Sequence, residues 1–193
     1  MSKLKILIAE DEYLVLMGLK RNLKELGHEI VAEAMDGKEA IKLAKEKSPD
    51  LIIADINMPE VDGIEAVKKI NKNRVIPSII VTGYSDNELI EKASKVGVFA
   101  YLVKPVGIEE LKASIIIAMN KYKEFKEVNK ELKDQKEALE NRKIIEKAKG
   151  ILMDTISLSE SEAMKKLQRK SQEENTKLVE VAKEIIKMSE YLN

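Results

Sequence analysis

Five side chains whose chemistry suits phosphoryl transfer stand at the ends of short apolar segments. Glu10 and Asp11 follow LKILIA, Asp55 closes DLIIAD, Thr82 closes SIIVT and Lys104 closes AYLVK. Each segment is almost continuously apolar, which is typical of a parallel strand buried on both faces. Open α/β sheets bind their ligands outside the carboxyl ends of the strands, so we expect these side chains to converge in one acidic pocket.

Three carboxylates in one pocket would repel one another and raise each other's pKa unless a cation lies among them. Mg²⁺ fits such a pocket, because it takes oxygen ligands and usually binds one or two carboxylates together with water and phosphate. We expect Asp11 and Asp55 to bind Mg²⁺ directly and Glu10 to act through water. Asn57 could add its backbone carbonyl.

With its charge balanced in this way, the pocket could transfer a phosphoryl group to the Asp55 carboxylate, which would act as the nucleophile. The transition state spreads its charge over the equatorial phosphoryl oxygens, so catalysis depends on positioning and neutralisation. Lys104 would place a positive charge beside one of these oxygens, and the Thr82 hydroxyl would donate to another.

The pattern of apolar residues, glycines and prolines predicts alternating strands and helices up to Gly107. We expect strands near residues 4–9, 29–34, 50–55, 77–82 and 98–103, and helices near 13–26, 38–47, 63–72 and 86–95. All four prolines and seven of the eight glycines lie in this part, so the remainder should be almost wholly helical. It begins with one long helix from Ile108 to about residue 153. The end of this helix is also the first of three helices in the tail. The second opens with a capping box between Ser159 and Glu162.

A heptad pattern along the long helix predicts a weak coiled-coil seam, which would suit a conditional dimer. The seam positions are Leu111, Ile115, Ala118, Tyr122, Phe125, Asn129, Leu132, Lys136 and Leu139. Polar residues at two of these positions fix the register at a cost in stability. The alternative is that the helix packs on its own domain.

Composition excludes several classes of site. The chain has no cysteine and a single histidine, so zinc-thiolate sites and multi-histidine metal sites are excluded. That histidine, His28, follows a glycine and is expected to be exposed. The 193 residues carry no net charge and no apolar run near the roughly 20 residues of a membrane span. We therefore expect a cytoplasmic protein without a membrane partner.

The quoted segments, in the forms LKILIAEDE, DLIIADINMPEVDG, SIIVTGYS and AYLVKP, resemble the response-regulator receiver domain of two-component signalling. The resemblance covers residues 1–120. It implies a doubly wound, five-stranded parallel sheet of the flavodoxin-like order 2-1-3-4-5, Mg²⁺ as cofactor and a sensor histidine kinase as partner.

The same resemblance assigns roles to residues. It implies that Asp55 is the phosphoacceptor, that Thr82 and Tyr101 are the switch pair, and that the Lys104–Pro105 element contacts phosphate, often through a cis peptide bond. The sequence departs from the family pattern at Glu10, where aspartate is usual, and at Gly83, where alanine is usual. Neither departure threatens phosphorylation.

The tail, from IIEKAKGILM through LSESEAM to LVEVAKEII, resembles the ANTAR domain of transcription antiterminators. This divides the chain into a receiver over residues 1–120, a coiled-coil linker helix over 108–141 and an ANTAR-like domain over 141–193, a small all-α domain of three helices. The resemblance implies a dimer that forms on phosphorylation and binds paired RNA stem-loops of leader transcripts.

Basic side chains cluster on two tail helices and are candidates for RNA contact. They are Arg142, Lys143, Lys147, Lys149, Lys165, Lys166, Arg169 and Lys170. From residue 141 onward, however, eleven basic residues face nine acidic ones, a smaller excess than nucleic-acid binders usually show. Two alternatives therefore stay open: a phosphorylation-dependent protein-interaction switch and a DNA-binding regulator. In all three cases the chain is a signalling protein rather than an enzyme.

Overall fold

The structure is a computed structural model that describes residues 3–72, 74–83 and 96–190. The chain forms two compact units, Met1–Lys126 and Glu127–Asn193, and each is described here by itself. None of the described helices combines the length and the apolar character that crossing a membrane requires.

The first unit contains a five-stranded parallel sheet in the order β2-β1-β3-β4-β5, as the resemblance implied. The strands are β1 (Lys5–Ala9), β2 (Glu29–Ala34), β3 (Leu51–Asp55), β4 (Ser78–Thr82) and β5 (Val98–Val103). The predicted strands agree with these bounds to within one residue. The apolar runs are continuous because β3 and β4 are fully buried, with side chains that alternate between two cores.

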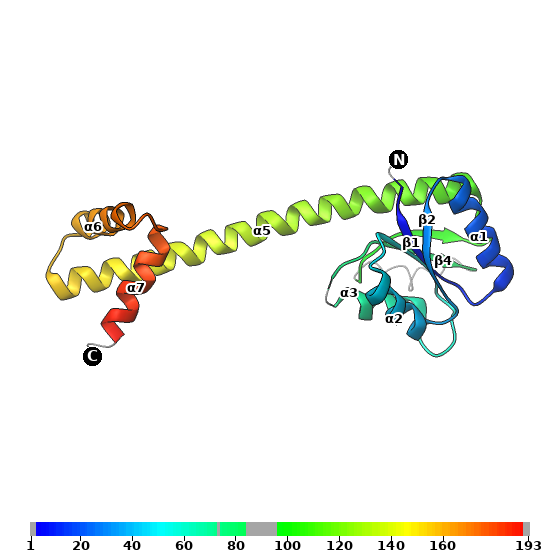
Figure 1. The fold of residues 1–193 in the computed structure, drawn as a ribbon, viewed down its shortest axis with the longest axis horizontal. Coiled ribbons are helices and arrows are strands. Elements are labelled where there is room, and N and C mark those ends of the chain that lie inside the picture. Colours follow the sequence, from blue (N-terminus) through cyan, green and yellow to red (C-terminus); the bar gives the residue numbers. More distant parts are fainter. Residues whose placement is uncertain (1–2, 73, 84–95, 191–193) are drawn as a thin grey trace. The chain divides into compact units, whose positions relative to one another are not determined.

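Helices cover both faces of this sheet (Figure 1). The helices α2 (Gly37–Lys47) and α3 (Gly63–Asn71) close one core around Leu7, Ile52 and Ile80. The helices α1 (Tyr13–Glu25) and α5 (Ile108–Ile156) close the other core around Ile6, Ile8 and Ile53. The helix predicted near 86–95 lies outside the described residues.

The coiled-coil seam is wrongly predicted for the first part of α5. Leu111, Ile115 and Ala118 are fully buried in the core of the first unit, so they cannot face a partner helix without unpacking it. Tyr122 is half-buried, and its hydroxyl donates to the carbonyl oxygen of Val75 at 3.0 Å. The alternative, that the helix packs on its own domain, therefore holds for this stretch.

The structure does not test the rest of the predicted seam. Phe125, Leu132 and Leu139 keep 40%, 47% and 55% of their surface exposed. These apolar side chains, with exposed Asn129 between them, remain available for a partner helix. Their role in a dimer stays a prediction.

The prediction that His28 is exposed is wrong, because only 6% of the residue is accessible. Its Nδ1 accepts the backbone N–H of Leu4 at 3.3 Å, which requires that nitrogen to be unprotonated. Burial lowers the pKa of the imidazole from its ordinary value. His28 is therefore a neutral core residue.

The second unit is a small helical domain built from the end of α5, α6 (Glu160–Glu173) and α7 (Leu178–Glu190). Ala148, Leu167, Val181 and Ala182 form its fully buried centre, and partly buried isoleucines and leucines surround them. The predicted capping box is confirmed: the Ser159 hydroxyl accepts the N–H of Glu162, and the Glu162 carboxylate accepts the N–H of Ser159. The first tail helix is the end of α5, which continues unbroken to Ile156.

Candidate functional site

The carboxyl ends of four strands bring the predicted site residues to one edge of the sheet. Asp55 ends β3, Thr82 ends β4, and Glu10 and Lys104 directly follow β1 and β5. The strand register places Ala9 beside Ala54 and Thr82 beside Val103. The backbone N–H of Lys104 also donates to the Thr82 carbonyl at 2.8 Å, which holds the end of β5 against β4.

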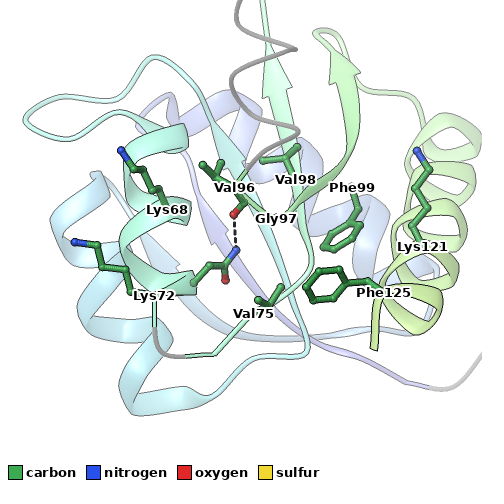
Figure 2. A pocket seen from close by; sticks show the side chains of 10 residues that line it. Lys68, Lys72, Val75, Val96, Gly97, Val98, Phe99, Lys121 and Phe125 are labelled. Atoms are coloured by element: carbon green, nitrogen blue, oxygen red, sulfur yellow. Dashed lines mark hydrogen bonds between the residues drawn. The ribbon is translucent and has the colours of Figure 1, made fainter. Parts of the chain in front are cut away.

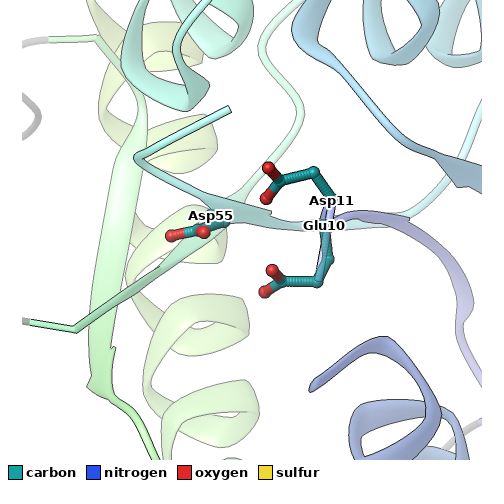
Figure 3. A group of neighbouring side chains, drawn as sticks. All are labelled: Glu10, Asp11 and Asp55. Atoms are coloured by element: carbon teal, nitrogen blue, oxygen red, sulfur yellow. The ribbon is translucent and has the colours of Figure 1, made fainter. Parts of the chain in front are cut away.

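Three carboxylates form the floor of this site (Figure 3). Glu10, Asp11 and Asp55 each offer an oxygen within 4.8 Å of the others, and Glu10 and Asp55 are buried. One oxygen of each carboxylate is buried without a hydrogen-bond partner among the described residues. Buried acceptors without partners cost free energy, and a hard divalent cation with oxygen ligands would satisfy all three. The donor set therefore fits Mg²⁺.

The Lys104 ammonium lies against two of these carboxylates, Glu10 and Asp55. Its Nζ donates to Asp55 Oδ2 at 2.9 Å and to Glu10 Oε1 at 3.0 Å. A third bond runs to Glu12 Oε1 at 2.8 Å, although the Glu12 side chain is mostly exposed. The peptide bond between Lys104 and Pro105 is cis, as expected. Sequence reasoning missed Glu12, because nothing in the spacing shows that its side chain turns back towards the pocket.

Two charged groups in the site have perturbed pKa values. Burial raises the pKa of the Glu10 carboxyl, although the hydrogen bond from Lys104 opposes this. Burial alone would lower the pKa of Lys104, but its hydrogen bonds to Glu12, Asp55 and Glu10 outweigh burial and raise it. Lys104 is therefore a permanent positive charge at physiological pH, fixed where negative charge would arrive on Asp55.

The loop after β3 is shaped around the backbone of Asp55. The N–H of Gly63 donates to the Ile56 carbonyl at 3.0 Å, and the Asp62 side chain caps α3 by accepting the N–H of Glu65 at 2.7 Å. A Cβ on Gly63 would stand 2.0 Å from the carbonyl oxygen of Asp55. Only glycine permits this close approach, which explains the Asp–Gly pair downstream of Asp55.

The remaining predicted residues of this site are Thr82, Tyr101 and Asn57, which differ in burial. Thr82 is buried at the edge of the pocket. Tyr101 is half-buried against the core beneath α2 and α3, and burial raises the pKa of its hydroxyl. Asn57 follows Asp55 by two residues and is exposed. The switch roles of Thr82 and Tyr101, and the carbonyl ligand from Asn57, stay predictions.

In the second unit, the candidate RNA-binding lysines and arginines fall into two groups. Lys165, Lys166, Arg169 and Lys170 line a cavity of about 620 Å³ that has Leu152 and Ile185 as its apolar part. Arg169 pairs with Glu173 at 2.7 Å, and Lys170 contacts Glu174 and Glu184. Neither Lys165 nor Lys166 has an ion-pair partner among the residues that the structure describes, so these two are the most available of the four cations.

The other group lies on α5 and is less uniform. Arg142 and Lys147 are exposed, and Lys143 pairs with Glu140 at 2.8 Å. The side chain of Lys149 is only 8% exposed and lies between Glu160 at 2.7 Å and Glu146 at 2.9 Å. These hydrogen bonds raise the pKa of Lys149, and the bond to Glu160 contributes most. Lys149 thus joins α5 to the start of α6.

Comparison with known proteins places both units in families. Residues 6–116 match the family described as response regulator receiver domain, and residues 133–186 match the ANTAR domain. The chain belongs to the response regulators that carry an ANTAR domain. It is 40% identical over 182 residues to the transcriptional regulatory protein PdtaR of Mycobacterium tuberculosis, a match that covers 94% of this chain and 89% of PdtaR.

Solved receiver structures resemble the first unit of this response regulator. The signal receiver domain of a modulated diguanylate cyclase from Desulfovibrio desulfuricans G20 is 32% identical with a TM-score of 0.59, and covers 63% of this chain and 98% of its own. A DNA-binding response regulator of the LuxR family from Staphylococcus aureus is 35% identical with a TM-score of 0.56, and covers 60% of this chain and 98% of its own. These matches support the receiver fold.

Proposed function

We propose that phosphorylation of Asp55 by a histidine kinase makes this response regulator dimerise and bind paired RNA stem-loops, which causes transcription antitermination. The observation that carries the proposal is the position of Lys104, whose ammonium contacts Asp55 and Glu10 beside three unsatisfied carboxylate oxygens. That arrangement is suited to receive a phosphoryl group, and the ANTAR domain supplies an output. Because leader transcripts are cytoplasmic, the proposal places the protein there.

In this proposal each side chain has a role in phosphoryl transfer. An oxygen of the Asp55 carboxylate would attack the phosphorus of a phosphohistidine. A P–O bond forms as the P–N bond breaks, and the electron pair stays on the imidazole nitrogen. Lys104 then moves its ammonium from the Asp55 carboxylate to a phosphoryl oxygen, and the Thr82 hydroxyl donates to another.

Glu10, Asp11 and Asp55 would hold the Mg²⁺, with the Asn57 carbonyl as a further ligand. When bound, Mg²⁺ neutralises charge on the carboxylates and on the phosphoryl oxygens. Burial raises the pKa of the Glu10 carboxyl, and a cation beside this carboxylate would oppose that rise.

The output would use cations of the second unit. Lys165 and Lys166 lie exposed on α6 beside the cavity that Arg169 and Lys170 also line. Lysine contacts to RNA phosphates release counterions, so affinity should fall as salt rises. The unit has little aromatic surface for stacking on bases, so we expect contacts to phosphate and sugar to dominate.

The test has a chemical step and a binding step. Acetyl phosphate with Mg²⁺ should label the wild-type chain and not Asp55→Asn, whereas the control Glu46→Gln, an exposed acid on α2, should label normally. The phosphorylated chain should then bind paired stem-loop RNA in preference to duplex DNA. Lys165→Gln/Lys166→Gln should weaken this binding, and the charge-matched control Lys177→Gln/Lys187→Gln should weaken it less.

The other two functions correspond to different results of the same assays. Preference for duplex DNA would support a DNA-binding regulator. Labelling of Asp55 without binding to either nucleic acid would support a protein-interaction switch and contradict the antitermination proposal.

A further inference from the structure

A second pocket lies in the first unit, at the edge of the sheet opposite Asp55. It has a volume of about 590 Å³ and is enclosed by the end of α3, the start of β5 and α5. Val98 is the first residue of β5, whereas Asp55 is the last residue of β3, and the strands are parallel. The phosphorylation chemistry does not use this pocket. Its volume lies within the range of sites for small molecules.

The floor of the pocket is apolar and partly aromatic. Phe99 and Phe125 meet edge to face with their ring centroids 6.0 Å apart, and Val75 and Val98 complete the surface. Phe125 nevertheless keeps 40% of its surface exposed. An aromatic ring exposed over an apolar floor favours an apolar or aromatic ligand body.

Hydrogen bonds fix the walls of the pocket. The Asn71 side chain donates to the Val96 carbonyl at 2.8 Å and accepts the N–H of Ile76 at 2.8 Å, so one amide joins the two loops that flank the pocket. Gly97 has a φ of +95°, and a Cβ there would stand 2.3 Å from Asn71 Nδ2. The Tyr122 hydroxyl ties α5 to the Val75 carbonyl at 3.0 Å. A pocket with walls held in this way is preformed, which lowers the cost of binding.

The rim of the pocket is positively charged. Figure 2 shows Lys68 and Lys72 on the α3 side and Lys121 on the α5 side. Lys68 has a loose contact with Glu65, at 3.6 Å. For Lys72 and Lys121, the described part of the chain offers no ion-pair partner. Cations on two sides of an apolar floor complement a ligand with an apolar body and an anionic group.

We propose that this pocket binds a small amphiphilic carboxylate with an aromatic body. The aromatic body would lie on Phe99 and Phe125, and the carboxylate would face Lys72 or Lys121. Such binding would use none of the residues of the phosphorylation site or of the candidate RNA contacts, although Phe125 is also a position of the predicted dimer seam.

The test uses 1-naphthoate as the probe and the neutral 1-naphthalenemethanol as its comparison. In amide NMR spectra of the full-length protein, naphthoate should shift the signals of residues 97–99 and 121–125, and it should bind more tightly than the alcohol. Lys72→Gln/Lys121→Gln should weaken naphthoate about fivefold and leave the alcohol unchanged. Phe125→Ala should weaken both probes.

Two comparisons keep the result interpretable. Lys24→Gln/Lys42→Gln removes the same charge from exposed sites outside the pocket and should leave both affinities unchanged. Labelling of Asp55 by acetyl phosphate should be normal in every variant, which shows that the receiver is folded. Absence of naphthoate binding at millimolar concentration, equal binding of the alcohol, or equal loss in both lysine double variants would overturn the proposal.

Discussion

Replacing Ile115 with alanine tests whether the first part of α5 belongs to the receiver core. Ile115 is fully buried and packs in the core that α1 and α5 close over the sheet. The substitution removes three carbon atoms, which at about 0.8 kcal/mol each corresponds to about 2.4 kcal/mol. The cavity left behind adds to this value, so we expect the free energy of unfolding of the receiver to fall by about 3 kcal/mol.

Urea unfolding at several protein concentrations measures this change. A core position predicts the same loss at every concentration, because the lost contacts lie within one chain. Leu139→Ala is the matched comparison: its side chain is 55% exposed, so we expect a loss below about 1 kcal/mol and weaker self-association. A small loss for Ile115→Ala, or a loss that appears only at concentrations where the protein is dimeric, would refute the core assignment and restore the full seam.

Three further predictions concern the pocket and the buried histidine. Mg²⁺ at ten times its Kd should raise the free energy of unfolding by about 1.4 kcal/mol, and a thermal shift that persists in Asp11→Asn would contradict the ligand assignment. Gly63→Ala should destabilise the receiver by about 1–3 kcal/mol and slow the labelling of Asp55, whereas Gly18→Ala, whose Cβ would meet nothing within 4 Å, should be neutral or stabilising; equal effects would show that the loop can shift. Burial lowers the pKa of His28, so the unfolded state binds its proton more readily. The stability that neutral His28 contributes to the fold is therefore fully present above its ordinary pKa of 6.5, and it is lost as the pH falls below that value. His28→Asn, whose amide oxygen can still accept a backbone N–H, should remove that part of the pH dependence, and an unchanged profile would assign it to another group.

The sheet and most of the acidic pocket around Asp55 could be predicted from the sequence. The central strands are buried on both faces, so their apolar runs are continuous and their ends are sharp. The residues that end these strands, Asp55 and Thr82, are charged or hydroxylated, which indicates the edge where chemistry occurs. The role of Glu12 could not be predicted, because it depends on the direction of its side chain. The burial of His28 could not be predicted either, because it depends on contacts between distant segments.

The coiled-coil pattern shows where sequence periodicity fails. A stripe of apolar residues spaced three and four apart faces a partner helix in a coiled coil, but it equally faces a sheet in a receiver core. Leu111, Ile115 and Ala118 satisfy both patterns, and only the packing decides between them. Lys149 is a similar case, since a lysine in a basic cluster gives no sign that two glutamates enclose it.

The affinity of the full chain for an RNA that carries two paired stem-loops tests the central claim most directly. It should be measured before and after treatment with acetyl phosphate and Mg²⁺, with Asp55→Asn treated in the same way. Because a dimer engages both loops together, we expect phosphorylation to tighten binding at least about tenfold in the wild type and to have no effect in Asp55→Asn. Equal affinity of the treated and untreated wild-type chain would contradict the claim that the charge on Asp55 controls the ANTAR domain.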